Sequence, residues 1–312
     1  MQATKNDIHL AEEVIKTLLY FDIFLYPLTA QEIFGFLGVD GCTPEDVTDS
    51  LSNLAEKELV FRFGDFYSLH PDQKNIRRRI KGNREAEKWL KIAEKKARFI
   101  AMFPFVQGVM ASGSLSKGYM DEHSDLDFFI VTAPNRLWIA RTLLVLYKRI
   151  FLFNSHKLFC VNYFVDNLHL EIEEKNIFTA TELATLIPLY NHGCYESLLA
   201  SNRWVLDFFP HFKAKTSPTL HKALQHKFRK IPELFLNPFS ATLDKFFMRI
   251  TLRRWNKIYA QKFEKNDFDI AFKTRRYVSK NHPNYYQKKI LDLYQIKLLE
   301  YKSSLGGLTR YD

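Results

Sequence analysis

Residues 106–131 read VQGVMASGSLSKGYMDEHSDLDFFIV: two apolar runs joined by a polar segment that contains glycine and serine. The first run predicts a strand that ends at Gly113-Ser114, and the second predicts another strand. Side chains alternate between the two faces of a strand, so Asp125 and Asp127 point to one side while Leu126 points the other way, into a core. Two acidic side chains on one face of an apolar strand cost free energy unless a cation lies between them.

The chemistry of these residues suits a metal and a phosphate. Mg²⁺ prefers carboxylate and phosphate oxygens. Gly113 permits a close backbone approach, and the hydroxyl and N–H of Ser114 can donate to a phosphate oxygen. Ser112, Lys117 and Ser124 are near enough in sequence to assist, although each also suits a surface or capping role. A phosphate-binding turn followed by a two-acid metal site predicts phosphoryl or nucleotidyl transfer.

These residues resemble the signature of the polymerase β-type nucleotidyltransferase superfamily, which is an apolar strand, Gly-Gly or Gly-Ser, a short helix and then Asp-x-Asp. The resemblance covers residues 105–170, and the wider arrangement is similar to a bacterial group with an N-terminal winged-helix-like domain and a helical C-terminal region. It implies that Asp125 and Asp127 hold two Mg²⁺ (or Mn²⁺) ions and that Gly113 and Ser114 hold a nucleoside triphosphate. The implied reaction transfers a nucleoside monophosphate to an acceptor hydroxyl and releases pyrophosphate. The acceptor is a small hydroxylated molecule, RNA or a protein, and the sequence does not rank these three.

The same resemblance implies a third carboxylate on a later strand, as a metal ligand or general base. Residues 157–165 predict this strand, with Asn162 at the expected place and Asp166 on the same face. An amide is a weaker ligand than a carboxylate and is no base, and Asp166 also suits the turn that follows. Glu171, on a predicted return strand at 168–172, is the other candidate. If the third acid is missing, the alternative is a catalytically degenerate protein that binds nucleotide or regulates.

Residues 1–72 predict a winged helix-turn-helix-like domain, with helices at 8–24, 30–37 and 44–57 and a hairpin at 59–69. Thr29 and Thr43 are the expected N-caps of the second and third helices. DNA binding depends on neutralising phosphates, yet the candidate recognition helix, residues 45–53, has three acids and no Lys or Arg. A DNA-binding regulator is therefore the weaker alternative, and DNA is not an expected partner.

The rest of the chain predicts a basic linking helix at 73–103, a nucleotidyltransferase domain at 104–210 and a basic helical region at 211–312. Within the middle domain we expect helices at 134–151, 180–190 and 191–208. Up to Gln73 there are 4 basic and 13 acidic residues, whereas from His211 onward there are 22 basic and 8 acidic residues. Such asymmetry concerns partners, and the basic end attracts phosphates. The predicted class is α+β, with a short mixed sheet flanked by helices.

Composition limits where the protein acts. A chain of 312 residues, 46% of them hydrophobic, can bury a large core. The longest apolar run, residues 138–153, is interrupted by three cations and is no membrane helix. The first residues do not read as a signal peptide, and three distant cysteines suit reduced thiols. We therefore expect a cytoplasmic protein that has no membrane partner.

Overall fold

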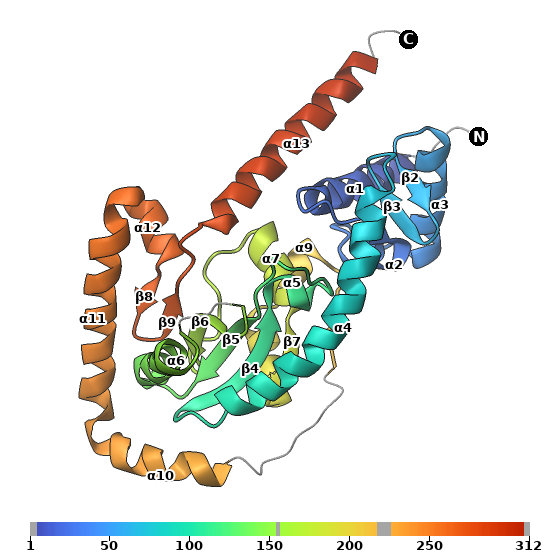
Figure 1. The fold of residues 1–312 in the computed structure, drawn as a ribbon. Helices are drawn as coiled ribbons and strands as arrows, with labels where there is room; N and C mark the ends of the chain where they lie inside the picture. The colour runs from blue at the N-terminus through green and yellow to red at the C-terminus, as the bar shows by residue number, and fades with distance from the viewer. Residues whose placement is uncertain (1–4, 154–156, 217–225, 309–312) are drawn as a thin grey trace.

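The computed structural model describes residues 5–153, 157–216 and 226–308 (Figure 1). An N-terminal unit of helices and a small sheet lies beside a six-stranded sheet. The helices of residues 226–271 flank the larger sheet on the side away from the N-terminal unit, whereas the last helix, residues 286–308, runs towards that unit and packs against its core. The mixed helix and strand content agrees with the predicted α+β class.

The described part of the N-terminal unit, from Lys5 onward, consists of three helices and three short strands. The helices are α1 (Lys5–Asp22), α2 (Ala30–Gly35) and α3 (Pro44–Glu56); the strands are β1 (Leu28–Thr29), β2 (Phe61–Phe63) and β3 (Phe66–Ser68), in the order β1-β3-β2. Thr29 and Thr43 each form a capping box, with Glu32 and Asp46 respectively. Both predicted N-caps are therefore confirmed, because their hydrogen bonds stay within one turn of the chain.

The large sheet is mixed, in the order β7-β4-β5-β6-β9-β8. Its strands are β4 (Val106–Ser112), β5 (Asp127–Thr132), β6 (Cys160–Asp166), β7 (Ile187–Tyr190), β8 (Thr274–Arg275) and β9 (Val278–Lys280). Only the β5–β6 pair is parallel among the described strands. The sheet draws strands from both sides of residue 210, where the sequence suggested a domain boundary.

Helices cover both faces of this sheet. Phe128 and Ile130 belong to a core shared with α4 (Lys74–Ile100) and α6 (Leu137–Phe151), whereas Phe129 and Val131 belong to a second core shared with α7 (Ile177–Thr185) and α8 (His192–Ser201). The alternation along β5 is the two-residue period of a strand buried on both sides. The short α9 (Val205–Phe208) joins the second core.

The C-terminal third is not helical throughout. Its elements are α10 (His226–Leu236), η1 (Asn237–Phe239), α11 (Ser240–Tyr259), η2 (Ala260–Lys262), α12 (Lys265–Ala271), the β8–β9 hairpin and α13 (Tyr286–Leu308). The hairpin was not predicted, and it extends the large sheet beside β6. On α13, Lys297 forms an ion pair with Asp22 of α1 at 2.7 Å. Every helix in the described parts of the chain is too short or too polar to cross a membrane.

Two other predicted elements are wrong. The helix predicted at 180–190 stops at Thr185, and residues 187–190 form β7 against β4. The return strand predicted at 168–172 is absent, and this part of the chain has no regular structure. There the side chain of Asn202 accepts from the N–H of Ile172 and donates to the carbonyl of Leu170, at 2.8 Å each. A buried amide thus satisfies backbone groups that a neighbouring strand would otherwise satisfy.

Candidate functional site

The Gly-Ser turn and the aspartate pair meet where β4 ends and β5 begins. Ser112 of β4 lies opposite Asp127 of β5. Gly113 follows with φ +64° and begins the single turn α5 (Gly113–Ser116). A Cβ atom on Gly113 would lie 2.4 Å from Oδ2 of Asp127. The backbone at Gly113 therefore packs against the Asp127 carboxylate at a place that only glycine fits.

Asp125 and Asp127 lie on either side of Leu126, which is fully buried. The N–H of Leu126 donates to the carbonyl of Lys157, and its own carbonyl accepts from the N–H of Cys160. These bonds continue the β5–β6 ladder by one residue and keep the backbone extended. In an extended backbone, side chains two residues apart leave the chain on the same side, and the negative charge of Asp125 acts on Asp127.

The Asp127 carboxylate lies in a place that disfavours its charge. Burial raises its pKa to about 6; a hydrogen bond with Cys160 acts the other way, Asp125 and Glu182 add to the rise, and Lys117 opposes it. A nearby cation therefore stabilises the charged form of a desolvated carboxylate that lies beside two other acids.

Two lysines border the aspartates. Nζ of Lys117 lies 2.6 Å from Oε1 of Glu182 on α7 and donates to the carbonyl of Gly113 at 3.2 Å. Lys148, near the end of α6, is only 6% exposed. Burial lowers the pKa of Lys148, and the negative charges of Asp125 and Asp127 act in the opposite direction. The site therefore combines three carboxylates with two ammonium groups around one glycine turn.

Cys160 and Asn162 occupy the part of β6 nearest the aspartates. Cys160 is the register partner of Asp127, and burial raises the pKa of its thiol. Asn162 falls at a register shift between Phe128 and Phe129, and its Nδ2 donates to Sγ of Cys160 at 2.8 Å. Asn162 thus contacts Cys160, and Cys160 is the residue of β6 that lies opposite Asp127.

The predicted serines have different surroundings. Ser112 pairs with Asp127 in the ladder, and Ser114 lies in the single turn α5. Ser124 is committed to a turn, since its hydroxyl donates to Oδ1 of Asp121 at 2.8 Å and accepts from the N–H of that residue. Ser124 therefore supports the approach to Asp125 from within the turn.

Asp166 and Glu171 do not reach the aspartate pair. Asp166 lies opposite Thr132, at the other end of the parallel β5–β6 pair, and its Oδ1 is 2.7 Å from Nδ1 of His169. Glu171 is exposed and pairs with Lys175 at 2.8 Å. The prediction that Asp166 acts beside Asp127 is therefore wrong. Asp166 is a turn residue at the far end of β6, as the other interpretation of this residue expected.

Lys148, Cys160 and Glu182 were not predicted to belong to this site. Lys148 is one of the three cations that interrupt the apolar run at residues 138–153, and this interruption is the signal that marks it in the sequence. A lysine inside an otherwise apolar helix needs a nearby carboxylate when it is buried. Glu182 offered no such signal, because it comes to the site only through the packing of α7.

A divalent cation fits this site only with ligands from outside the chain. The described residues hold no group of three or more His, Cys, Asp or Glu side chains placed to bind a metal. Asp125 and Asp127 supply two carboxylates, and the packing of Gly113 against one of them leaves that side closed to other side chains. Mg²⁺ commonly binds one or two carboxylates together with substrate phosphates and water. The donor set therefore fits a cation that arrives with a phosphate ligand.

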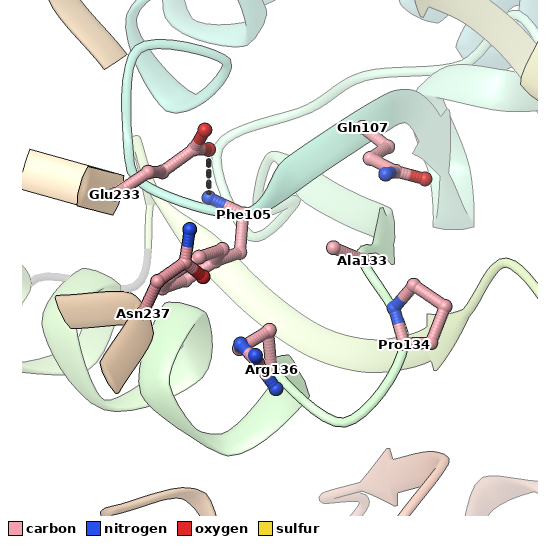
Figure 2. A pocket seen from close by; sticks show the side chains of 7 residues that line it. All are labelled: Phe105, Gln107, Ala133, Pro134, Arg136, Glu233 and Asn237. Carbon is pink, nitrogen blue, oxygen red and sulfur yellow. Dashed lines mark hydrogen bonds between the residues drawn. The ribbon is translucent and has the colours of Figure 1, made fainter. Parts of the chain in front are cut away.

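A cavity of about 270 Å³ lies at the other end of β4 and β5 (Figure 2). Its walls include Gln107, Arg136, Glu233 and Asn237, and Glu233 accepts a hydrogen bond from the N–H of Phe105 at 2.7 Å. Because β4 and β5 are antiparallel, the start of β4 and the end of β5 lie a full strand length away from Ser112 and Asp127. This cavity is distinct from the aspartate site.

Comparisons with protein-family models, with curated proteins and with solved structures each found no match. The functional proposal therefore rests on the geometry of the site.

Proposed function

We propose that the protein is a Mg²⁺-dependent nucleotidyltransferase, which transfers a nucleoside monophosphate from a nucleoside triphosphate to an acceptor hydroxyl. The observation that carries the proposal is the contact between Gly113 and the Asp127 carboxylate. This contact joins a turn suited to phosphate and an acid pair suited to Mg²⁺ within a few ångströms. The order of a strand, Gly-Ser, a single helical turn and a strand with Asp-x-Asp is the order that the resemblance to polymerase β-type nucleotidyltransferases calls for. On this proposal the N-terminal unit is the winged-helix-like domain of that arrangement.

The residues divide the work as follows. Asp125 and Asp127 would hold Mg²⁺, which when bound neutralises phosphate charge and activates the acceptor hydroxyl. The N–H groups and hydroxyl at Gly113-Ser114 would orient the triphosphate. Lys117, now 2.6 Å from Glu182, can exchange that carboxylate for a phosphate oxygen.

A second candidate is a degenerate protein of the same fold that binds nucleotide without transferring it. The amide of Asn162 and the thiol of Cys160, where the family has a third carboxylate, favour this candidate. Glu182 is the additional acid whose charge acts on Asp127, and it could replace the missing carboxylate. Transfer activity therefore depends on whether Glu182 is released from Lys117.

A DNA-binding regulator is the weakest candidate. The exposed side of α3 carries Glu45, Asp46, Asp49 and Glu56, and these acids would repel the phosphates of DNA.

The basic C-terminal third tilts the choice of acceptor for the transferase towards a large anionic molecule such as RNA.

The experiment uses the full chain with nucleoside triphosphates labelled at the α-phosphate, with Mg²⁺ or Mn²⁺, alone and with RNA. We expect label transfer that is lost in Asp125→Ala and Asp127→Ala but kept in Asp269→Ala, a matched exposed acid on α12. Nucleotide binding without transfer in the folded wild type supports the degenerate protein. A folded protein that shows neither nucleotide binding nor label transfer would contradict both the transferase and the degenerate nucleotide-binding protein.

A further inference from the structure

Helix α10 turns its apolar side outward. Ile231, Leu234 and Phe235 are 63%, 72% and 74% exposed, and their spacing places them on one stripe of the helix. Phe239 of η1 continues the stripe and is also largely exposed. Large apolar side chains gathered on a surface mark a place of interaction.

The opposite side of α10 fixes this orientation. Glu233 accepts from the backbone N–H of Phe105 (Figure 2), and Leu236 packs against the central core. Glu233 thus points to the protein, while the apolar stripe points to solvent. This is the reverse of the usual amphipathic helix of a globular protein.

The neighbouring helix α11 presents cations around two exposed apolar residues, Phe246 and Ile250. Lys245, Arg249 and Arg253 are exposed there. The stretch 230–262 contains two acids, and both are turned inward: Glu233 to Phe105, and Asp244 to the N–H of Trp138 at 2.7 Å. The outer surface of α10 and α11 therefore combines apolar side chains with positive charge alone.

We propose that this surface, made by Ile231, Leu234, Phe235, Phe239, Lys245 and Arg249, binds the face of an anionic lipid bilayer. Leu, Ile and Phe side chains enter the boundary between head groups and acyl chains, and Lys and Arg contact the lipid phosphates. RNA would pair with the cations but would leave the aliphatic residues uncovered. The proposal concerns binding to a membrane surface and not crossing, and it departs from the sequence-based expectation that no membrane takes part. It stands independently of the aspartate site.

The test measures co-sedimentation of the full chain with vesicles of phosphatidylcholine, alone or with one quarter phosphatidylglycerol. We expect binding to the anionic vesicles only, weakened by salt. The pair Leu234→Ser and Phe235→Ser should reduce partitioning by about tenfold or more. Leu168→Ser is the matched control, since Leu168 is equally exposed at 72% on a loop elsewhere. Lys245→Glu with Arg249→Glu should reduce binding similarly, whereas Lys91→Glu, an exposed lysine of α4, should change it little.

Several outcomes would overturn the proposal. Equal binding to neutral and anionic vesicles, or binding that survives Leu234→Ser with Phe235→Ser, excludes the lipid surface. A concentration-dependent dimer lost in that double variant shows that a second copy covers the stripe. If the protein does not bind vesicles but binds RNA, and Lys245→Glu with Arg249→Glu abolishes the RNA binding, the surface is a nucleic-acid interface instead. The substituted side chains are exposed, so the variants should melt within a few degrees of the wild type.

Discussion

Gly113 is the residue on which the candidate site depends most directly. Its positive φ turns the chain from β4 into α5, and its missing side chain leaves room for the Asp127 carboxylate. Backbone conformation and close packing are separate demands, and a second glycine with almost the same φ allows them to be measured apart. Gly64, in the turn between β2 and β3, has φ +62° and nothing near its Cβ position.

Gly113→Ala should therefore cost more stability than Gly64→Ala. Left-handed backbone alone costs an L-residue about 1–2 kcal/mol, and this applies to both sites. The clash with Asp127 should add about 1–3 kcal/mol at Gly113. Urea unfolding of the two variants measures the difference, and equal losses would contradict the close contact.

Asp127→Asn tests the cost of the buried carboxylate. The folded pKa of about 6 lies above the usual value of about 4, so the native state binds more protons between these two pH values. Wild-type stability should thus fall as the pH rises from about 4 to 6, and the penalty should persist above that range. Asp127→Asn avoids it and should be more stable than the wild type by about 1–2 kcal/mol above pH 6, with little difference near pH 4.

Urea unfolding at pH 4.5 and 7.5 checks this expectation. The control is Asp269→Asn, an exposed position, where the difference in unfolding free energy from the wild type should be the same at both pH values. Millimolar Mg²⁺ with a nucleoside triphosphate should raise the melting temperature of the wild type and leave that of Asp127→Asn unchanged. A gain in stability that does not vary with pH would exclude titration of Asp127 as its source.

At the scale of elements, a carboxylate on one helix caps another. Asp244 of α11 is fully buried, and its Oδ1 accepts from the N–H groups of Trp138 and Ile139 at the start of α6. No intrahelical carbonyl is available to the first N–H groups of a helix, so this distant side chain acts as the cap. The C-terminal third is in this way joined to the helix that carries Lys148.

Asp244→Ala and Asp244→Asn should differ sharply. Alanine leaves two buried N–H groups without an acceptor and should cost about 3 kcal/mol. Asparagine keeps an acceptor oxygen and removes a charge whose pKa burial raises, so its cost should be about 1 kcal/mol. Asp46→Ala, in the exposed capping box of α3, should cost less than Asp244→Ala, because water can replace the lost hydrogen bonds there. Thermal and urea unfolding compare the three; equal losses for the two Asp244 variants would show that the charge itself matters.

Across the whole molecule, Arg79 of α4 holds the N-terminal unit to the sheet. It is 5% exposed, donates to the carbonyl of Pro27, pairs with Glu32 at 2.6 Å and lies over the ring of Tyr26. Tyr26 in turn donates to the carbonyl of Lys117, directly after α5. The acidic unit therefore supports the glycine turn of the candidate site from outside.

Arg79→Ala should weaken this junction and cost about 2–4 kcal/mol, because it removes a buried cation from its partners. Arg62→Ala, at an exposed arginine that also lies near a tyrosine ring, should cost under about 1 kcal/mol. All four tryptophans lie outside residues 1–72. Unfolding transitions followed by tryptophan fluorescence and by circular dichroism should then have the same midpoint in the wild type and different midpoints in Arg79→Ala. Coincident transitions in the variant would contradict the role of Arg79.

Short-range patterns determined part of this protein from its sequence. The capping boxes at Thr29 and Thr43, the strand into Gly113, and the common side of Asp125 and Asp127 all depend on residues within a few positions of one another. Asp-x-Asp beside an apolar run already predicts a bound cation. Alternation along a strand is a property of the backbone itself, and it places both carboxylates on one face.

Only the tertiary structure decided the rest. Pro188 lies in β7 because that strand is at the sheet edge, where a proline is tolerated, and not because local propensity favours a strand there. Asn202 replaces the expected return strand, and α6 and α7 bring Lys148 and Glu182 to the aspartates. These contacts join residues that are far apart in sequence, so their free energy comes from burial and from satisfying buried polar groups, which no local window records.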